Sequence, residues 1–261
     1  MRFGAAILLL LVAAALLSVV WTPFPPNALD IPHRLLPADA AHPFGRDQYG
    51  RDVASLLLAG ARETLLTSVV AVSVGLAVGV PAGVAAALGG VGDAVLMRAA
   101  DLVFAFPALL VAVMLTAATG PGVGVAIVAI GVFTASVFAR VARNAAAGVW
   151  GREYVLAARV CGRGTVAIAV RHVLPNIAGI LVVQAALQLG LAIVADAGLS
   201  YVGLGAQPPT PSWGRMLNDA QTYVWRAPWL AIVPGAAIAV TVFGLTLLGD
   251  GLRDRLDPRL R

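Results

Sequence analysis

The side chains that most often carry chemistry are few and far apart in this sequence. Its three histidines, His33, His42 and His172, and its one cysteine, Cys161, show no metal-ligand spacing and allow no disulfide within the chain. All 18 basic residues are arginines, so the lysine of a Walker A loop and the amine of a Schiff-base enzyme are both missing. We therefore expect no catalytic residue, no metal site and no cofactor in this chain, and any ATP with its Mg must bind to a partner.

One basic segment, residues 140–176, has a pattern that predicts a folded unit. Glu153 to Val160 favours a helix, Gly162 and Gly164 end it, and a second short helical stretch leads to Leu174-Pro175. Helix, glycine break and helix form an elbow that projects from the adjoining membrane span. The alternative is an arginine-rich loop that serves only as a topology signal.

Long apolar stretches must position this segment. The chain is 60% hydrophobic and 12% charged with a mean hydropathy of +0.90, which is more apolar surface than one soluble core of 261 residues can bury. Stretches that can cross a bilayer core of about 30 Å predict an all-α membrane protein with six transmembrane helices. They are Phe3–Trp21, Thr64–Gly92, Leu102–Ala139 (two helices split by a turn at Thr119–Gly122), Ile177–Ala195 and Trp229–Leu248.

The start of the chain fits either a secretory signal or a retained membrane anchor. The 19 uncharged residues after Arg2 favour the anchor, because signal cores usually have about 7 to 15 residues. Three prolines then end the helix, and the polar stretch Thr22 to Glu63 predicts a loop or small lid. We divide the chain into residues 1–63, a first transmembrane helix with an extracytoplasmic segment, and residues 64–261, a core with five transmembrane helices and the cytoplasmic loop 140–176.

Three glycines give the second stretch a smooth face. Gly75, Gly79 and Gly83 recur every four residues, which places three missing side chains on one side of a helix. Such a face lets another helix approach closely in lipid. The alternative is that these glycines, together with Pro81, merely bend the span.

The apolar stretches contain little that could bind or move an ion. They hold no Asp, Glu, Arg or His, which disfavours an ion-coupled secondary transporter, a channel with a charged filter and a membrane-embedded enzyme. The most polar pair is Gln184 and Gln188, one helical turn apart. Their amides either line a solute path or hydrogen-bond to a neighbouring helix, and the second role is slightly favoured.

The arginine distribution predicts the orientation of the helices. With the N-terminus inside, the inner segments hold 12 arginines and the outer segments hold 6. Short loops rich in positive charge stay in the cytoplasm, so we expect both termini there. Membrane topology also explains the net charge of +5 better than nucleic-acid binding does, because basic and aromatic residues do not interleave.

The elbow carries a family resemblance. Glu153 to Arg159, Gly162, and Arg171 to Asn176 resemble the EAA loop of binding-protein-dependent ABC importer permeases. In that family the loop forms a coupling helix seated in a groove of the ATPase subunit. Leu156 stands where the motif has glutamate and His172 where it has isoleucine, and Glu153 is the candidate replacement for the missing acid. The residues that the resemblance assigns to the coupling loop are Glu153, Ala157, Ala158, Arg159, Gly162, Arg163, His172, Leu174 and Pro175.

Further segments are similar to one group of that family, the second permease of dipeptide, oligopeptide and nickel importers. They are His42–Asp52 followed by Gly60-Ala61-Arg62, Leu199–Gly205, Gln207–Gly214, Leu248–Asp254 and Leu256–Arg259. The resemblance implies the type I ABC importer permease architecture and a subunit of the bacterial cytoplasmic (inner) membrane. It implies peptides as cargo, dipeptides first, with nickel or haem as the alternative. The implied partners are a second homologous permease, one or two ATP-binding subunits and an extracytoplasmic solute-binding protein.

Overall fold

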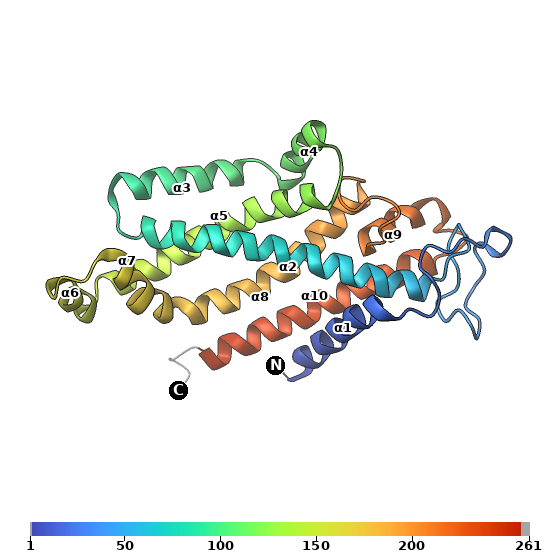
Figure 1. Cartoon of the computed structure of the whole chain (residues 1–261), viewed down its shortest axis with the longest axis horizontal. Coiled ribbons are helices and arrows are strands. Elements are labelled where there is room, and N and C mark those ends of the chain that lie inside the picture. The colour runs from blue at the N-terminus through green and yellow to red at the C-terminus, as the bar shows by residue number, and fades with distance from the viewer. Residues whose placement is uncertain (1, 257–261) are drawn as a thin grey trace.

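Long apolar helices dominate the computed structural model, which describes residues 2–256 (Figure 1). Five of them are long and apolar enough to cross a bilayer, and a bent pair of shorter helices supplies a sixth span when it is counted as one. The prediction of an all-α membrane protein with six spans is confirmed. The five long helices are α1 (Arg2–Val20), α2 (Val53–Ala86), α5 (Val123–Trp150), α8 (Leu174–Tyr201) and α10 (Trp229–Leu256).

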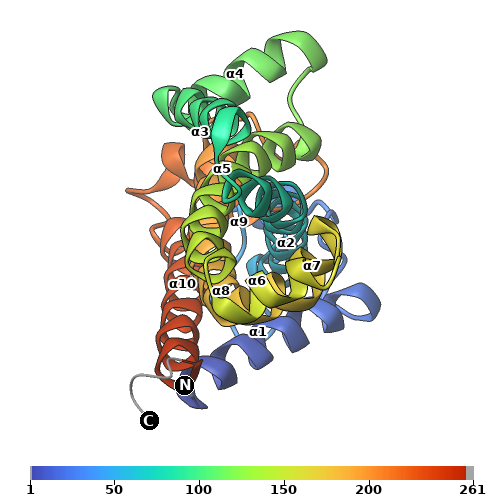
Figure 2. The ribbon, with the colours of Figure 1, turned by 90° about the vertical axis from the view of Figure 1, so that its left-hand side faces the viewer.

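Shorter helices lie at the two ends of this bundle and on one side of it. The bent pair is α3 (Gly90–Ala105) and α4 (Ala108–Thr119), which lie on the side opposite α1 (Figures 1 and 2). The rest are η1 (Ile31–His33), α6 (Glu153–Val160), α7 (Thr165–Ile168), the π-turn η2 (Ala169–Val173), α9 (Trp213–Ala220) and η3 (Gln221–Tyr223). The elbow containing α6 and α7 and the loop of residues 22–52 lie at opposite ends of the bundle (Figure 1).

The glycine face of α2 packs directly on α5, as the spacing predicts. A Cβ added at Gly79 would lie 2.2 Å from the backbone oxygen of Ala135, and one at Gly83 would lie 2.2 Å from that of Ala139. At Gly75 the added atom would lie 2.7 Å from Thr134. Only glycine permits this separation of the two backbones, so α2 and α5 form the centre of the bundle.

The second helix begins earlier than the sequence predicts. We expected Thr22 to Glu63 to be irregular, but α2 starts at Val53, so the charged pair Arg62 and Glu63 lies within a helix. The Asp52 side chain caps α2 by accepting a hydrogen bond from the backbone N–H of Ser55 at 2.8 Å. Burial of the first turn of α2 adds to this cap, and together they outweigh the charges that suggested a loop.

We predicted that the third span is a helix beginning at Leu102, and the structure differs. Helix α3 starts at Gly90, and α4 turns away from it by 86°. The bend falls at Phe106-Pro107, where Phe106 is extended (φ −105°, ψ 125°). Proline lacks an N–H and disfavours helical geometry in the residue before it, which accounts for the break. The predicted turn at Thr119–Gly122 is confirmed, because α4 ends at Thr119 and Gly120 has a φ of +82°.

The fifth span also extends beyond its uncharged stretch. Helical structure is continuous from Thr165 to Tyr201, whereas the uncharged stretch runs only from Ile177 to Ala195, and the helix includes an aspartate, Asp196. The side chain of Asp196 is buried, with 3% exposed. The uncharged stretches therefore underestimate the lengths of the helices. The helices continue past the ends of these stretches and include ionisable residues there.

The connection between α8 and α10 contains a helix that the proline-rich pattern did not predict. Ser212 caps α9, and Trp213, the first residue of this helix, is buried with 1% of its surface exposed. The indole Nε1 of Trp213 donates to the backbone oxygen of Leu57 on α2 at 3.1 Å. On its other side α9 touches α8, since a Cβ at Gly214 would lie 2.3 Å from the oxygen of Ala197. Helix α9 is thus wedged between α2 and α8.

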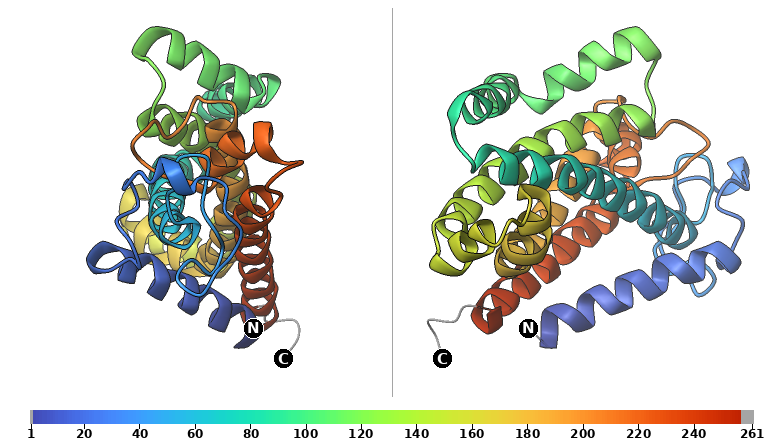
Figure 3. Two further views of the ribbon diagram at one scale, coloured as in Figure 1. Left: turned by 90° about the vertical axis from the view of Figure 1, so that its right-hand side faces the viewer. Right: turned by 60° about the vertical axis from the view of Figure 1, so that its left-hand side comes forward.

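The first helix is packed against the last. Gly4 on α1 and Gly244 on α10 form a close crossing, where a Cβ at Gly4 would lie 2.7 Å from the backbone oxygen of Gly244. Helix α1 crosses the bundle on the side away from α4 (Figure 3). The segment Leu256–Arg259, which carries part of the family resemblance, lies outside the described residues from Asp257 onward.

Candidate functional site

The elbow, residues Arg152 to Pro175, is anchored to the end of α5 by three apolar side chains. Val155 on α6, Ile168 on α7 and Val173 have no exposed surface, and they belong to the same core as Trp150 at the end of α5. Helix α6 and the start of the α7–α8 helix therefore hold a fixed position at this end of the bundle. The predicted order of helix, glycine break and helix is confirmed.

The turn after α6 depends on the conformation of Gly162. Its N–H donates to the oxygen of Arg159 at 3.0 Å, and the N–H of Arg163 donates to the oxygen of Ala158 at 3.1 Å. This pair of bonds is the Schellman arrangement that satisfies the last carbonyls of a helix. Gly162 has a φ of +79°, and an added Cβ would meet no atom within 4 Å. Glycine is needed here for its backbone freedom and not for space.

The elbow presents apolar side chains to its surroundings. Large exposed fractions belong to Leu156 (47%), Val160 (89%), Val166 (77%) and Val170 (59%). They lie on α6, on α7 and in the π-turn, which are the short helices at the end of the bundle. Exposed apolar side chains gathered on a projecting element are typical of a protein-binding surface.

The residues assigned to the coupling loop lie together on this unit. Most are exposed, namely Glu153, Ala157, Arg159, Gly162, Arg163 and Pro175, whereas Ala158, His172 and Leu174 are half-buried. His172 packs against Tyr154 with ring centroids 6.1 Å apart, and the Arg159 guanidinium lies 6.0 Å from the Trp150 ring centroid. His172 therefore helps to join the two arms of the elbow. Glu153 is the first residue of α6, where its charge complements the helix dipole.

The two glutamines of α8 differ in burial. Gln188 is buried with 3% exposed, and Gln184 is half-buried. They lie on one face, as predicted from their spacing. Gln184 is the more accessible of the two to a solute.

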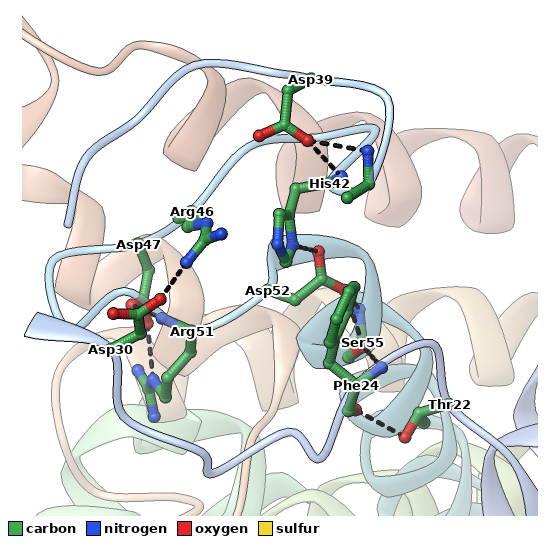
Figure 4. A network of polar contacts seen from close by, with 11 residues as sticks. Thr22, Phe24, Asp30, Asp39, His42, Arg46, Asp47, Arg51, Asp52 and Ser55 are labelled. Carbon is green, nitrogen blue, oxygen red and sulfur yellow. Dashed lines mark hydrogen bonds and ion pairs between the residues drawn. The ribbon is translucent and has the colours of Figure 1, made fainter. Parts of the chain in front are cut away.

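At the other end of the bundle, residues 22–52 fold around a buried His–Asp pair (Figure 4). His42 Nδ1 donates to Asp52 Oδ1 at 2.9 Å, and the two residues are 5% and 3% exposed. Ser55 Oγ donates to Asp52 Oδ2 at 2.6 Å and accepts from the N–H of Phe24 at 2.9 Å. The ring of Phe24 stacks on His42 with centroids 4.4 Å apart. The carboxylate lies between the histidine and the serine, so this arrangement ties a loop to α2 and does not activate a nucleophile.

Two aspartates, the exposed Asp39 and the half-buried Asp30, complete the loop. Asp39 accepts from the backbone N–H groups of Ala41 and His42, and these bonds lower the pKa of its carboxyl. Asp30 contacts His33 and Arg46, and its pKa is lowered chiefly by the bond to His33. Both carboxyls therefore stay ionised to a lower pH than a free aspartate does.

A second group of charges joins the loop to α9. Asp47 accepts from Arg51 Nε at 2.6 Å, and Arg51 Nη2 lies 3.7 Å from Asp219 Oδ2 on α9. Arg215 Nε lies 3.3 Å from Asp219 Oδ1. Burial raises the pKa of the Asp219 carboxyl, and Arg215 and Arg51 oppose that shift. Our sequence reasoning missed this group, although the four-residue spacings of Asp47 with Arg51 and of Arg215 with Asp219 were visible.

Comparison with known proteins identifies the family of the chain. Residues 79–261 match the family described as the inner membrane component of binding-protein-dependent transport systems. The chain belongs to this family. Among the residues that the structure describes, no group of three or more His, Cys, Asp or Glu side chains is placed to hold a metal ion.

Curated relatives narrow the family to the peptide, nickel and glutathione group of ABC importer permeases. The chain is 38% identical to the nickel transport system permease protein NikC of Escherichia coli K12, over 99% of this chain and 94% of that protein. It is also 38% identical to the probable D,D-dipeptide transport system permease protein DdpC of the same strain, over 95% and 85% of the two chains. Identity is 40% to the glutathione transport system permease protein GsiD of Pectobacterium atrosepticum, over 85% and 74%.

A solved structure shares the fold. A chain of the inward-facing MetNI methionine ABC transporter superimposes with a TM-score of 0.64 at 22% identity, covering 77% of this chain and 96% of that one. The expected type I importer permease architecture is confirmed. The chain is thus a multi-pass permease subunit of an ABC importer, a class that works with ATPase and binding-protein partners.

Proposed function

We propose that this permease imports peptides, dipeptides in the first place, across the bacterial cytoplasmic membrane. The names of two relatives, DdpC for D,D-dipeptide and GsiD for glutathione, support this cargo. Nickel is the second candidate, because NikC aligns over 99% of the chain. A second homologous permease completes the solute path, in which Gln184 and Gln188 are our candidate lining residues.

The partner subunits bind and hydrolyse ATP, and the elbow transmits their motion to the helices. The observation that carries this proposal is the apolar surface of Leu156, Val160, Val166 and Val170 on a unit anchored by fully buried side chains. A rigid element that binds the ATPase through an apolar surface can transmit its movement to the helices, whereas a mobile loop cannot. The π-turn joins the arm to α8, so movement of the elbow reaches a membrane span directly.

Both termini lie on the cytoplasmic side in this proposal, and an extracytoplasmic binding protein delivers the solute to the opposite side. The arginine distribution supports this orientation. The start of α1 and the end of α10 also point toward the end of the bundle that carries the elbow (Figure 1).

Co-purification in mild detergent tests the ATPase contact. The double variant Leu156→Asp, Val160→Asp should lose the ATPase subunit, because it places charge on the apolar surface. Val202→Asp is the matched control, since Val202 is 57% exposed and lies just beyond the end of α8, far from the elbow. A wild-type chain that is consistently isolated without an ATPase contradicts the proposal.

Uptake of labelled dipeptide, nickel and haem, in cells with and without this chain, tests the cargo. We expect dipeptide uptake alone to depend on the chain. Nickel uptake that depends on it, with dipeptide uptake unchanged, would decide for the second candidate.

A further inference from the structure

A pocket of about 350 Å³ opens between the 22–52 loop, the proline-rich loop and α9. Its walls are mainly apolar, and its charged lining comes from Arg51, Arg215 and Asp219. Pockets that bind small ligands combine such apolar walls with a few convergent polar groups. The apolar lining consists of Leu29, Tyr49, Leu56, Pro208, Pro209, Pro211 and Met216.

The two arginines have donors left to offer a ligand. Arg51 is held rigidly by Asp47 through Nε and by the Tyr49 ring, whose centroid lies 4.9 Å from the guanidinium carbon. Arg51 Nη2 is 3.7 Å from Asp219 Oδ2, beyond hydrogen-bond distance. Arg215 Nε is buried 3.3 Å from Asp219 Oδ1, so a ligand in the pocket would reach Arg215 through its terminal Nη1 and Nη2 groups. Guanidinium groups with free donors are suited to a carboxylate, which they bind with two parallel bonds.

The charges of the pocket select a neutral zwitterion. Arg51 and Arg215 are balanced by Asp47 and Asp219, so a ligand that brings one negative and one positive group leaves the balance unchanged. Burial disfavours the charged form of the Asp219 carboxyl, and an ammonium group beside it would offset that cost. A divalent cation such as Ni²⁺ would face two guanidinium groups in the same space.

We propose that this pocket is a reception site for a zwitterionic short peptide on the outer side of the permease. The carboxylate binds Arg215 and the free end of Arg51, the ammonium group binds Asp219, and an apolar side chain packs on the proline-rich loop. This inference rests on the proposed function, because it assumes that the loop faces the side from which peptides arrive. It assigns the permease itself a part in choosing peptide over nickel.

Saturation-transfer NMR on the importer complex in nanodiscs, without any binding protein, tests the site. The probes are the dipeptide Ala-Leu, its C-terminal amide, its N-acetyl form and NiCl₂. Ala-Leu should bind, and loss of either charged end should weaken binding about tenfold or more, as expected when a charge-assisted hydrogen bond is removed. Equal binding of Ala-Leu and its amide, or competition by NiCl₂, overturns the proposal.

Matched variants locate the site. Arg215→Gln and Asp219→Asn should each weaken Ala-Leu binding about tenfold, and Arg215→Lys should recover part of the loss because it keeps the charge. Arg226→Gln is the control, because Arg226 is an exposed arginine near α9 that does not line the pocket. Basal ATPase activity and the melting temperature show that each variant complex is intact.

The outcomes separate this inference from the function on which it rests. A complex that hydrolyses ATP and imports dipeptide, yet binds Ala-Leu equally in wild type and Arg215→Gln, refutes the pocket alone. If Arg215→Gln weakens only the affinity of the binding protein for the complex, the pocket is a protein-docking site and the proposal is wrong. Failure of dipeptide uptake in wild-type cells refutes the proposed function itself.

Discussion

Asp93 on α3 and Arg143 on α5 form a bidentate ion pair, in which Nε and Nη2 of the arginine lie 2.8 and 2.6 Å from Oδ1 and Oδ2 of the carboxylate. Arg140, one turn earlier on α5, pairs with Asp101, and its guanidinium lies over the Phe104 ring. These contacts fasten α3 along α5 up to the bend at Phe106-Pro107. They hold α3 in place, so α4 extends from a helix that is fixed to α5.

Breaking the Asp93–Arg143 pair should loosen α3. Asp93→Asn and Arg143→Gln should each lower the melting temperature of the purified complex, and a double-mutant cycle should give a small favourable coupling, as expected for a bidentate pair on an exposed surface. The charge-reversed pair Asp93→Arg, Arg143→Asp should restore part of the loss. Strictly additive single effects would show that the pair contributes nothing.

Gly79 should not tolerate even a methyl group. In Gly79→Ala the new Cβ meets the backbone oxygen of Ala135 at 2.2 Å, and no rotamer change can relieve a backbone clash. We expect destabilisation of about 1–3 kcal/mol, typical of overpacking, seen as a lower melting temperature and lower membrane abundance. Gly148→Ala on α5 is the control, because its Cβ meets nothing within 4 Å and alanine favours the helix. Equal effects at the two positions would contradict the packing of α2 on α5.

Gly162 should respond to conformation rather than to size. Gly162→Ala must adopt a φ of +79°, which costs about 1–2 kcal/mol for an L-residue, and the end of α6 should then rearrange. Gly162→Asn should be milder, because asparagine enters this region more readily. The measurement is peptide imported per ATP hydrolysed, which should fall more in Gly162→Ala than in Gly162→Asn. Normal coupling in both variants would remove the Schellman turn from the mechanism.

Asp219 should make stability depend on pH. Burial raises the pKa of its carboxyl in the folded protein above the unfolded value of about 3.9, so the folded state binds the proton more tightly. The contribution of Asp219 is most favourable at low pH and is lost as pH rises from about 4 through the raised pKa. In Asp219→Asn the melting temperature should change less with pH in that window than it does in wild type. An unchanged pH profile would mean that Arg215 and Arg51 fully offset the burial.

The sequence by itself determined the class of the protein and its main internal contact. Uncharged stretches predict spans because lipid penalises charge, and the four-residue glycine spacing predicts a close helix pair because helical geometry is local. The same locality made the elbow readable, since Glu153 to Gly162 contains both its helix and its stop. The missing lysine is a compositional fact that needs no structure.

Only the tertiary structure decided where the helices end and which distant charges meet. Helix α2 extends back to Val53, and α8 includes Asp196, because caps and burial between helices offset charges that a local pattern treats as breaks. Arg51 and Asp219 are 168 positions apart in the sequence, and they share a pocket because α9 is wedged between α2 and α8. Such a meeting depends on how the folded helices pack on one another, and local sequence spacing carries no record of it.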